Sequence, residues 1–175
     1  MWLDLAMSAM TESCKSKFSL DSLLNEMPVS KGSFYWHFEN RAEFLSALVE
    51  YWGRHDTQLP ADALDKLSQP VSAEDKLWKL MCMVYELRHT RHDLLIRSLT
   101  LEFPELHKAV ARVDQIRYQT VRDLFAEMGF EDNVLDMRTL AFITTTSLDR
   151  LMLVDIPDGA YKRQLKLRHA FFIHP

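Results

Sequence analysis

Three residues that commonly begin helices stand ten or eleven positions apart early in the chain. The side chains of Ser19, Ser30 and Asn40 can each accept a hydrogen bond from a free N–H group in the first turn of a following helix. Pro28 ends the first of these helices, because proline lacks an N–H group and disfavours a helical conformation of the preceding residue. Starts spaced so closely leave room only for short helices joined by tight turns.

Apolar residues behind these starts recur at the spacing of one helix face. They predict short helices over residues 20–27 and 31–38 and a longer helix after Asn40. Glu43 follows Asn40 at the spacing of a capping box, and a similar apolar stripe predicts a first helix over residues 2–14. The inner faces are expected to carry Leu20, Leu23, Leu24 and Met27 on the second helix, Phe34 and Phe38 on the third, and Phe44, Leu45, Leu48, Val49 and Trp52 on the fourth.

The remainder of the chain also has a helical pattern. Only 4 glycines and 6 prolines occur among 175 residues, which is too few turn-forming residues for a β-rich fold of this length. Residues 57–72, in which Pro60 and Pro70 flank a short helical piece over residues 61–67, form the seam that follows a small N-terminal domain and begins a larger one. We therefore predict an all-α protein with domains over residues 1–55 and 56–175. Longer helices are expected over residues 73–89, 92–102, 104–128, 133–154 and 158–172.

Three short helices, of which the second and third are joined by a three-residue turn, form a helix-turn-helix. In this motif the N-terminal end of the recognition helix faces base edges in the major groove of DNA. Gly32 and Ser33 are small enough for a close approach there, and Lys31 can reach a guanine edge or a phosphate. The caps Ser19 and Ser30 place backbone N–H groups where a phosphate can dock.

Tyr35, Trp36 and His37 are three consecutive large side chains with polar ends on the predicted third helix. Phe34 and Phe38 already occupy its inner face, so the three side chains between them must project partly outward. An ordinary three-helix bundle without a binding role would expose at most one such aromatic residue. The three together therefore predict a contact surface.

The string VSKGSFYWHFENRAEFL at residues 29–45 closely resembles the signature of the tetracycline-repressor (TetR) family of transcriptional regulators. The resemblance extends over about residues 19–49, and Pro28 stands where the family usually has a glycine. It implies an N-terminal helix-turn-helix domain that binds double-stranded DNA and a C-terminal helical domain that binds an effector and dimerises. It further implies base contacts by Lys31, Gly32 and Ser33, phosphate contacts by Tyr35, His37 and Arg41, a sugar or thymine-methyl contact by Trp36, and a helix cap at Ser19.

The resemblance also implies a small-molecule effector that releases the protein from DNA. Most aromatic and methionine side chains of the later helices are expected to form the hydrophobic core, and some are expected to line an effector pocket. The last two predicted helices carry more apolar residues than one face needs, which suits either a homodimer interface or closure of the monomer's own core. The expected pocket residues are Trp52, Trp78, Met81, Tyr85, Phe103, Phe125 and Phe142, and the surplus apolar residues are Leu148, Leu151, Met152, Val154, Leu165, Leu167, Phe171, Phe172 and Ile173.

Other classes of protein find little support in the sequence. No run of about 18 apolar residues predicts a membrane span, and no basic segment followed by an apolar one predicts a signal peptide, so we expect a bacterial cytosolic protein. Glu86 and His89 form one E-x-x-H pair, whereas a di-metal bundle needs two, and the nearby His92 and Asp93 fit a solvated helix end. No nucleophile with its base and no glycine-rich phosphate loop is found. We therefore expect neither an enzyme nor a cofactor or metal site.

The acidic charge of the N-terminal segment argues against DNA binding. Residues 1–55 carry five Lys and Arg residues and seven Asp and Glu residues, a net charge of −2, and the whole chain has a net charge of −4. DNA-binding domains are usually basic, because neutralising phosphates supplies much of their affinity. The sequence thus predicts a dimeric repressor of a palindromic operator, and the alternative is a helical small-molecule-binding or scaffold protein with a vestigial motif.

Overall fold

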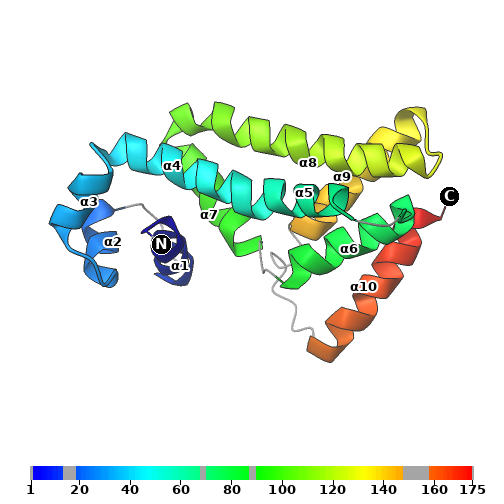
Figure 1. The fold of residues 1–175 in the computed structure, drawn as a ribbon, viewed down its shortest axis with the longest axis horizontal. Coiled ribbons are helices and arrows are strands. Elements are labelled where there is room, and N and C mark those ends of the chain that lie inside the picture. Colours follow the sequence, from blue (N-terminus) through cyan, green and yellow to red (C-terminus); the bar gives the residue numbers. More distant parts are fainter. Residues whose placement is uncertain (1, 14–18, 68–69, 87–89, 148–157, 175) are drawn as a thin grey trace. The chain divides into compact units, whose positions relative to one another are not determined.

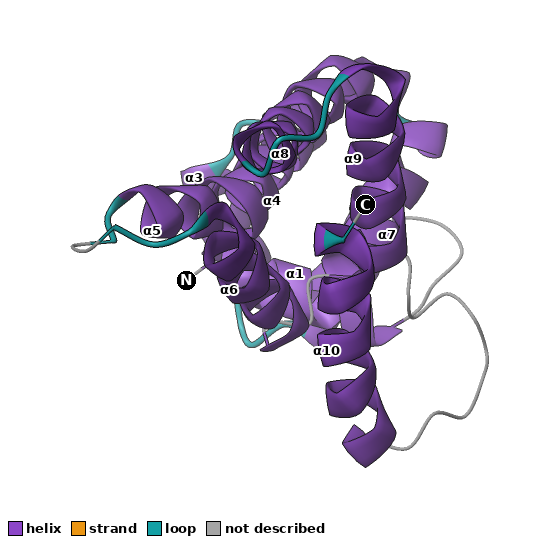
Figure 2. Ribbon diagram, turned by 90° about the vertical axis from the view of Figure 1, so that its right-hand side faces the viewer, coloured by secondary structure: helices purple, strands orange, loops and turns teal. Residues whose placement is uncertain are grey.

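In a computed structural model of the chain, the described segments are helices joined by loops, and none of their residues lies in a β-strand (Figure 2). The all-α prediction is therefore confirmed. The structure describes residues 2–13, 19–67, 70–86, 90–147 and 158–174. The chain divides into two compact units, a first unit of Met1–His55 with Arg91–Val113 and a second unit of Asp56–Thr90 with Asp114–Pro175.

The first unit holds the short N-terminal helices, coloured blue to cyan in Figure 1, together with a later segment of the chain. The inner-face residues predicted for its second, third and fourth helices are buried or packed against its core, as expected. Its helices are α1 (Trp2–Ser13), α2 (Leu20–Glu26), α3 (Lys31–His37), α4 (Arg41–Gly53), α7 (Thr90–Glu102), the 3-10 turn η2 (Pro104–Leu106) and the first residues of α8 (His107–Glu127).

Two contacts hold α4 against the later segment of the first unit. The indole N–H of Trp52 donates a hydrogen bond of 2.8 Å to the carboxylate of Asp93 in α7, and both residues are buried. At Gly53 an added Cβ would lie 2.6 Å from Cγ2 of Val113 in α8, so the two helices approach more closely than a larger residue allows. The fourth helix is therefore fixed by both a polar and a steric contact.

The second unit packs around phenylalanine rings from three helices. The rings of Phe125 and Phe142 have centroids 5.8 Å apart, and those of Phe142 and Phe172 lie 5.2 Å apart, both with edges facing faces. Asp136 of α9 accepts hydrogen bonds from Tyr118 and Arg122 of α8 at 3.0 and 2.9 Å. The elements are the π-helical turn η1 (Arg54–Gln58), whose last three residues belong here, α5 (Leu59–Asp65), α6 (Ala73–Glu86), the rest of α8, α9 (Asp132–Ser147) and α10 (Asp158–Ile173).

Several boundaries differ from the sequence prediction. The helix expected over residues 104–128 starts at His107, because residues 104–106 form a separate 3-10 turn that begins with proline. The α8 helix ends before Gly129, which has a φ of +90°, the left-handed conformation expected of a helix-ending glycine. The last part of the helix expected over residues 133–154 lies outside the described residues.

The predicted boundary at residue 55 coincides with the end of one segment of the first unit, but the chain later returns to that unit. Residues 91–113 pack with the N-terminal helices, whereas a hydrophobic pattern along the chain gives no sign of such a return. The functional division into domains 1–55 and 56–175 stays a prediction.

Candidate nucleic-acid interface

Serine caps begin the two helices on either side of the turn. The hydroxyl oxygen of Ser19 accepts a hydrogen bond from the backbone N–H of Ser22 at 3.3 Å, and that of Ser30 accepts one from Ser33 at 3.1 Å. Both cap residues are exposed. The capping that the sequence predicted is thus confirmed, and the docking of a phosphate at these helix starts stays a prediction.

The third helix has one buried face and one that faces solvent. Phe34 is fully buried and Phe38 nearly so, and their rings contact that of Phe44. Tyr35 and Trp36 are 55% and 81% exposed, and His37 is exposed as well. The outward projection predicted for these side chains is confirmed, so α3 presents three polar-tipped rings at the surface.

A tryptophan of α1 packs against α3 and donates a hydrogen bond to it. The indole N–H of Trp2 donates a hydrogen bond of 3.1 Å to the hydroxyl of Ser33, and its ring packs edge-on against those of Phe34 and Phe38. This bond uses one of the two acceptor lone pairs of the Ser33 hydroxyl, whose own O–H can still donate. The apolar stripe predicted the helix that contains Trp2 but gave no sign that its side chain would reach Ser33, 31 positions away.

The lysine at the start of α3 is paired with a carboxylate of α2. The ammonium of Lys31 lies 2.9 Å from a carboxylate oxygen of Asp21, and both side chains are well exposed. The hydrogen bond from this ammonium to Asp21, together with the charge of Asp21, raises the pKa of Lys31 above its ordinary value. This ion pair joins two different helices, and the sequence analysis did not predict it.

The start of α4 is held by its own cap and by an aromatic ring. The side chain of Asn40 accepts a hydrogen bond from the N–H of Glu43 at 3.0 Å, as predicted, but Glu43 accepts its bond from Glu39 at 2.6 Å rather than from Asn40. The guanidinium of Arg41 lies 4.7 Å from the ring centre of Phe103, a cation–π contact. Arg41 is exposed beside α3, and its predicted phosphate contact stays a prediction.

The seven residues expected to line an effector pocket fall into two separate cores. Met81, Phe125 and Phe142 are buried, and Trp78 and Tyr85 are half-buried. The core of the first unit contains Trp52 and Phe103, and the core of the second unit contains or contacts Trp78, Met81, Tyr85, Phe125 and Phe142. The structure therefore distributes the seven over two units, and a pocket lined by them stays a prediction.

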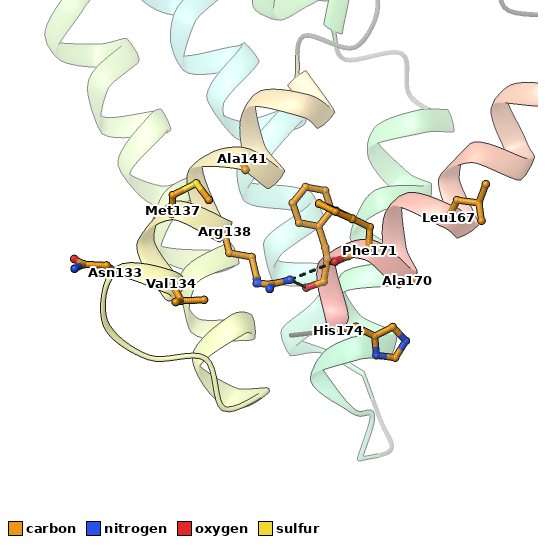
Figure 3. A pocket seen from close by; sticks show the side chains of 10 residues that line it. Asn133, Val134, Met137, Arg138, Ala141, Leu167, Ala170, Phe171 and His174 are labelled. Atoms are coloured by element: carbon orange, nitrogen blue, oxygen red, sulfur yellow. Dashed lines mark hydrogen bonds between the residues drawn. The ribbon is translucent and has the colours of Figure 1, made fainter.

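A groove of about 800 Å³ runs along α9 and α10 on the second unit (Figure 3). Four apolar side chains that line it are more than half exposed, and we call them the α9–α10 surface: Val134, Met137, Leu167 and Phe171. Arg138 also lines the groove and donates hydrogen bonds of 3.3 and 2.7 Å to the carbonyls of Phe171 and Phe172. This arginine therefore ties α9 to the last turn of α10.

The apolar surplus predicted for the last helices is only partly accounted for by this surface. Leu165 and Phe172 are buried in the core of their own unit, whereas Leu167 and Phe171 face solvent. Ile173 is half-buried against that core. The remaining surplus residues, Leu148, Leu151, Met152 and Val154, lie outside the described part of the chain.

Within the described segments, His, Cys, Asp and Glu side chains do not gather in groups of three that could hold a metal ion. His89 of the E-x-x-H pair lies outside those segments. The expectation that Asp93 belongs to a solvated helix end is wrong, because its carboxylate is buried and accepts the hydrogen bond from Trp52. The helices that the structure describes include none long and apolar enough to cross a membrane.

Comparison with known proteins gives two curated relatives, and no family model matches the chain. The chain is 32% identical over 78 residues to the probable HTH-type transcriptional regulator ArpR of Pseudomonas putida, and 31% identical over 78 residues to the HTH-type transcriptional regulator TtgR of the same species. Each match covers 45% of this chain and about a third of the relative's length. These relatives confirm the resemblance to helix-turn-helix transcriptional regulators that the motif indicates.

Proposed function

We propose that this chain is a DNA-binding transcriptional regulator and that α3 is its recognition helix. The observation that carries the proposal is the division of α3 into a buried phenylalanine face and an outer face of Tyr35, Trp36 and His37. A helix that served only the core would not need three large polar-tipped rings in solvent. The similarity to two helix-turn-helix regulators supports the same function.

The outer face of α3 can divide its contacts between bases and backbone. Lys31 and Ser33 stand in the first turn, where a recognition helix meets base edges, and Gly32 leaves room for the approach. Tyr35 and His37 follow in the next turn, where a hydroxyl and a ring N–H can donate to phosphate oxygens. Trp36, which is 81% exposed, offers a flat apolar face to a sugar or a thymine methyl group.

We further propose that the protein acts as a homodimer on a palindromic operator in the bacterial cytosol. Two recognition helices would then enter successive major grooves, about 34–36 Å apart. The α9–α10 surface supports this, because four exposed apolar side chains beside one groove form a patch that a second copy can cover. The interface would include the last two long helices.

Repression would be relieved by a small-molecule effector that binds among the aromatic side chains of the helical cores. The seven predicted pocket residues remain the candidates for that site. An effector needs only to prefer one spacing of the two recognition helices over another, and DNA affinity then changes by the same coupling free energy. A thermal-shift screen of small apolar compounds tests this part, since a bound effector raises the unfolding temperature.

The DNA-binding function is tested by fluorescence anisotropy with a labelled random-sequence duplex at low salt. We expect binding whose constant falls steeply as salt rises, because Lys and Arg contacts to phosphate release counterions. The double variant Lys31→Ala, Tyr35→Ala should lose specific binding to a duplex selected from a random pool by the wild type, while its circular dichroism and thermal unfolding stay unchanged, since both side chains are exposed. Lys108→Ala, on an exposed position of α8 in the same unit, removes the same charge and should leave most binding intact.

The net charge of −2 over residues 1–55 favours a second candidate, a helical small-molecule-binding or scaffold protein with a vestigial motif. This candidate predicts no binding to DNA at low salt, or a response that does not depend on salt. It also predicts that Lys31→Ala, Tyr35→Ala behaves like the wild type in every assay. Either result would reject the proposed regulator.

A further inference from the structure

Lys31 is the only lysine or arginine between residues 18 and 40, and it is the residue that Asp21 engages. The two charged atoms are 2.9 Å apart and join the first turn of α2 to the first turn of α3. Neither side chain is buried: their exposed fractions are 62% for Lys31 and 77% for Asp21. The pair is therefore exposed to solvent at the start of α3, the helix that we propose binds DNA.

Pairing with a carboxylate changes which acceptors the ammonium prefers. A lysine ammonium has three N–H donors, and the contact with Asp21 uses one of them. The other two can still donate to a neutral acceptor, such as O6 or N7 of guanine. A phosphate is attracted to the charge of Lys31 but repelled by the nearby charge of Asp21, so the attraction of the pair as a whole is small.

We propose that Asp21 is a specificity-determining residue of the DNA-binding surface, whose carboxylate reserves the Lys31 ammonium for base-edge acceptors and weakens its attraction to backbone phosphate. This inference rests on the proposed function. It gives the acidic balance of the N-terminal segment a role, because an unpaired Lys31 would bind phosphate and so strengthen binding to sequences that offer it no base-edge acceptor. Discrimination between sequences arises here from suppressing the non-specific contact.

Asp21→Asn tests the inference in the full-length protein, because it keeps the shape of the side chain and removes its charge. Two duplexes are compared by anisotropy over a salt series: a random-sequence duplex and one selected from a random pool by the wild type. We expect the affinity of the variant for the random duplex to rise about threefold to fivefold, the upper part of the range of an exposed ion pair. Affinity for the selected duplex should change by less than about twofold, and the salt dependence on the random duplex should steepen by about one ion.

Two further variants separate the ion pair from a general effect of charge. Glu50→Gln removes one negative charge at an exposed position near the end of α4 and should leave the ratio of the two affinities unchanged. Lys31→Gln should abolish the gain caused by Asp21→Asn when the two substitutions are combined, because the carboxylate acts through the ammonium. Thermal unfolding of each variant, expected to match that of the wild type, confirms that the fold is retained.

The results of these experiments distinguish failure of the proposed function from failure of this inference. If the wild type binds neither duplex, the proposed function fails and this inference fails with it. If the wild type binds DNA, the inference alone is overturned by any of three results: no gain with Asp21→Asn, an equal gain on both duplexes, or a gain that persists in the Lys31→Gln background. A gain confined to the random duplex and dependent on Lys31 supports it.

Discussion

Two surfaces of this protein expose aromatic or apolar side chains, and they differ in what those side chains carry. On α3 the exposed rings have polar ends, and they stand beside a lysine and a serine cap. On the α9–α10 surface the exposed groups are Val134, Met137, Leu167 and Phe171, which have no polar end. Both surfaces are therefore exposed, and they differ in whether their side chains carry hydrogen-bonding groups.

The difference indicates two kinds of partner. Nucleic-acid interfaces are polar and hydrated, so side chains that combine a flat ring with a hydrogen-bonding group suit them. An apolar patch beside a groove is instead stabilised by being covered with another apolar surface, as in a homodimer. The predictions below test whether each surface serves only the partner that its chemistry suits.

The largest effect is expected on the buried face of α3, and its exposed face provides the comparison. Phe34→Ala should lower the free energy of unfolding by about 3–5 kcal/mol, because a fully buried ring leaves a cavity among Trp2, Phe38 and Phe44. Chemical denaturation followed by circular dichroism measures this. Trp36→Ala, two positions along and 81% exposed, should lower DNA affinity with little change in stability. A large loss of stability in Trp36→Ala would show that the outer face is structural.

The second effect concerns the α9–α10 surface. Phe171→Asp should weaken the proposed dimer about thirtyfold, corresponding to ~2 kcal/mol, because it places a charge in the middle of an apolar contact. Sedimentation velocity over a range of protein concentrations gives the dissociation constant. Leu101→Asp is the matched control, since Leu101 is 85% exposed on α7 and lies outside this surface. Equal weakening by both variants would remove the distinction between the two sites.

How much of each surface the sequence could predict follows from the range of the signals involved. Ser19, Ser30 and the buried faces of α2 to α4 were predicted, because caps and helical periodicity act over a few residues. The bonds from Trp2 to Ser33 and from Lys31 to Asp21 were missed, because they join different helices. They depend on how the helices pack, which no local pattern contains.

The α9–α10 surface was predicted less well for the same physical reason. The sequence shows that α10 has surplus apolar residues, but only packing decides that Phe172 turns inward while Phe171 faces solvent. Val134 and Met137 were not predicted at all, because their helix has apolar residues on more than one side and gives no clear inner face. Neighbouring positions of similar hydrophobicity can therefore have opposite roles.

A smaller effect should arise where the recognition region joins α4. Asn40→Ala removes the side chain that accepts the N–H of Glu43 and should cost about 1 kcal/mol of unfolding free energy. Asn40→Asp keeps an acceptor there and should restore most of the loss, as chemical denaturation will show. The dissociation constant of the proposed dimer should be the same in both variants. A change in dimerisation would mean that the two surfaces are not independent.

The smallest effect compares two ion pairs, one on each unit. The hydrogen bonds from Arg122 and then Tyr118 lower the pKa of Asp136 below its ordinary value of 3.8. Because the folded-state pKa is depressed, the stabilisation from Asp136 is fully present above that ordinary value and is lost as the pH falls through the lower folded value. The difference in denaturation midpoint between the wild type and Asp136→Asn should thus be constant near neutral pH and shrink below about pH 4.

The same substitution at Asp21 should behave in the opposite way. Asp136 joins α8 to α9 within one unit, so its loss should change stability and leave DNA affinity unaltered. Asp21 holds a lysine on the exposed face, so its loss should change DNA affinity and leave stability nearly unaltered. Measuring both properties on both variants, over the same range of pH, assigns each carboxylate to the fold or to the interface. If Asp136→Asn alters DNA affinity at a pH where the protein remains folded, the two units do not act separately, and the contrast between the two surfaces fails.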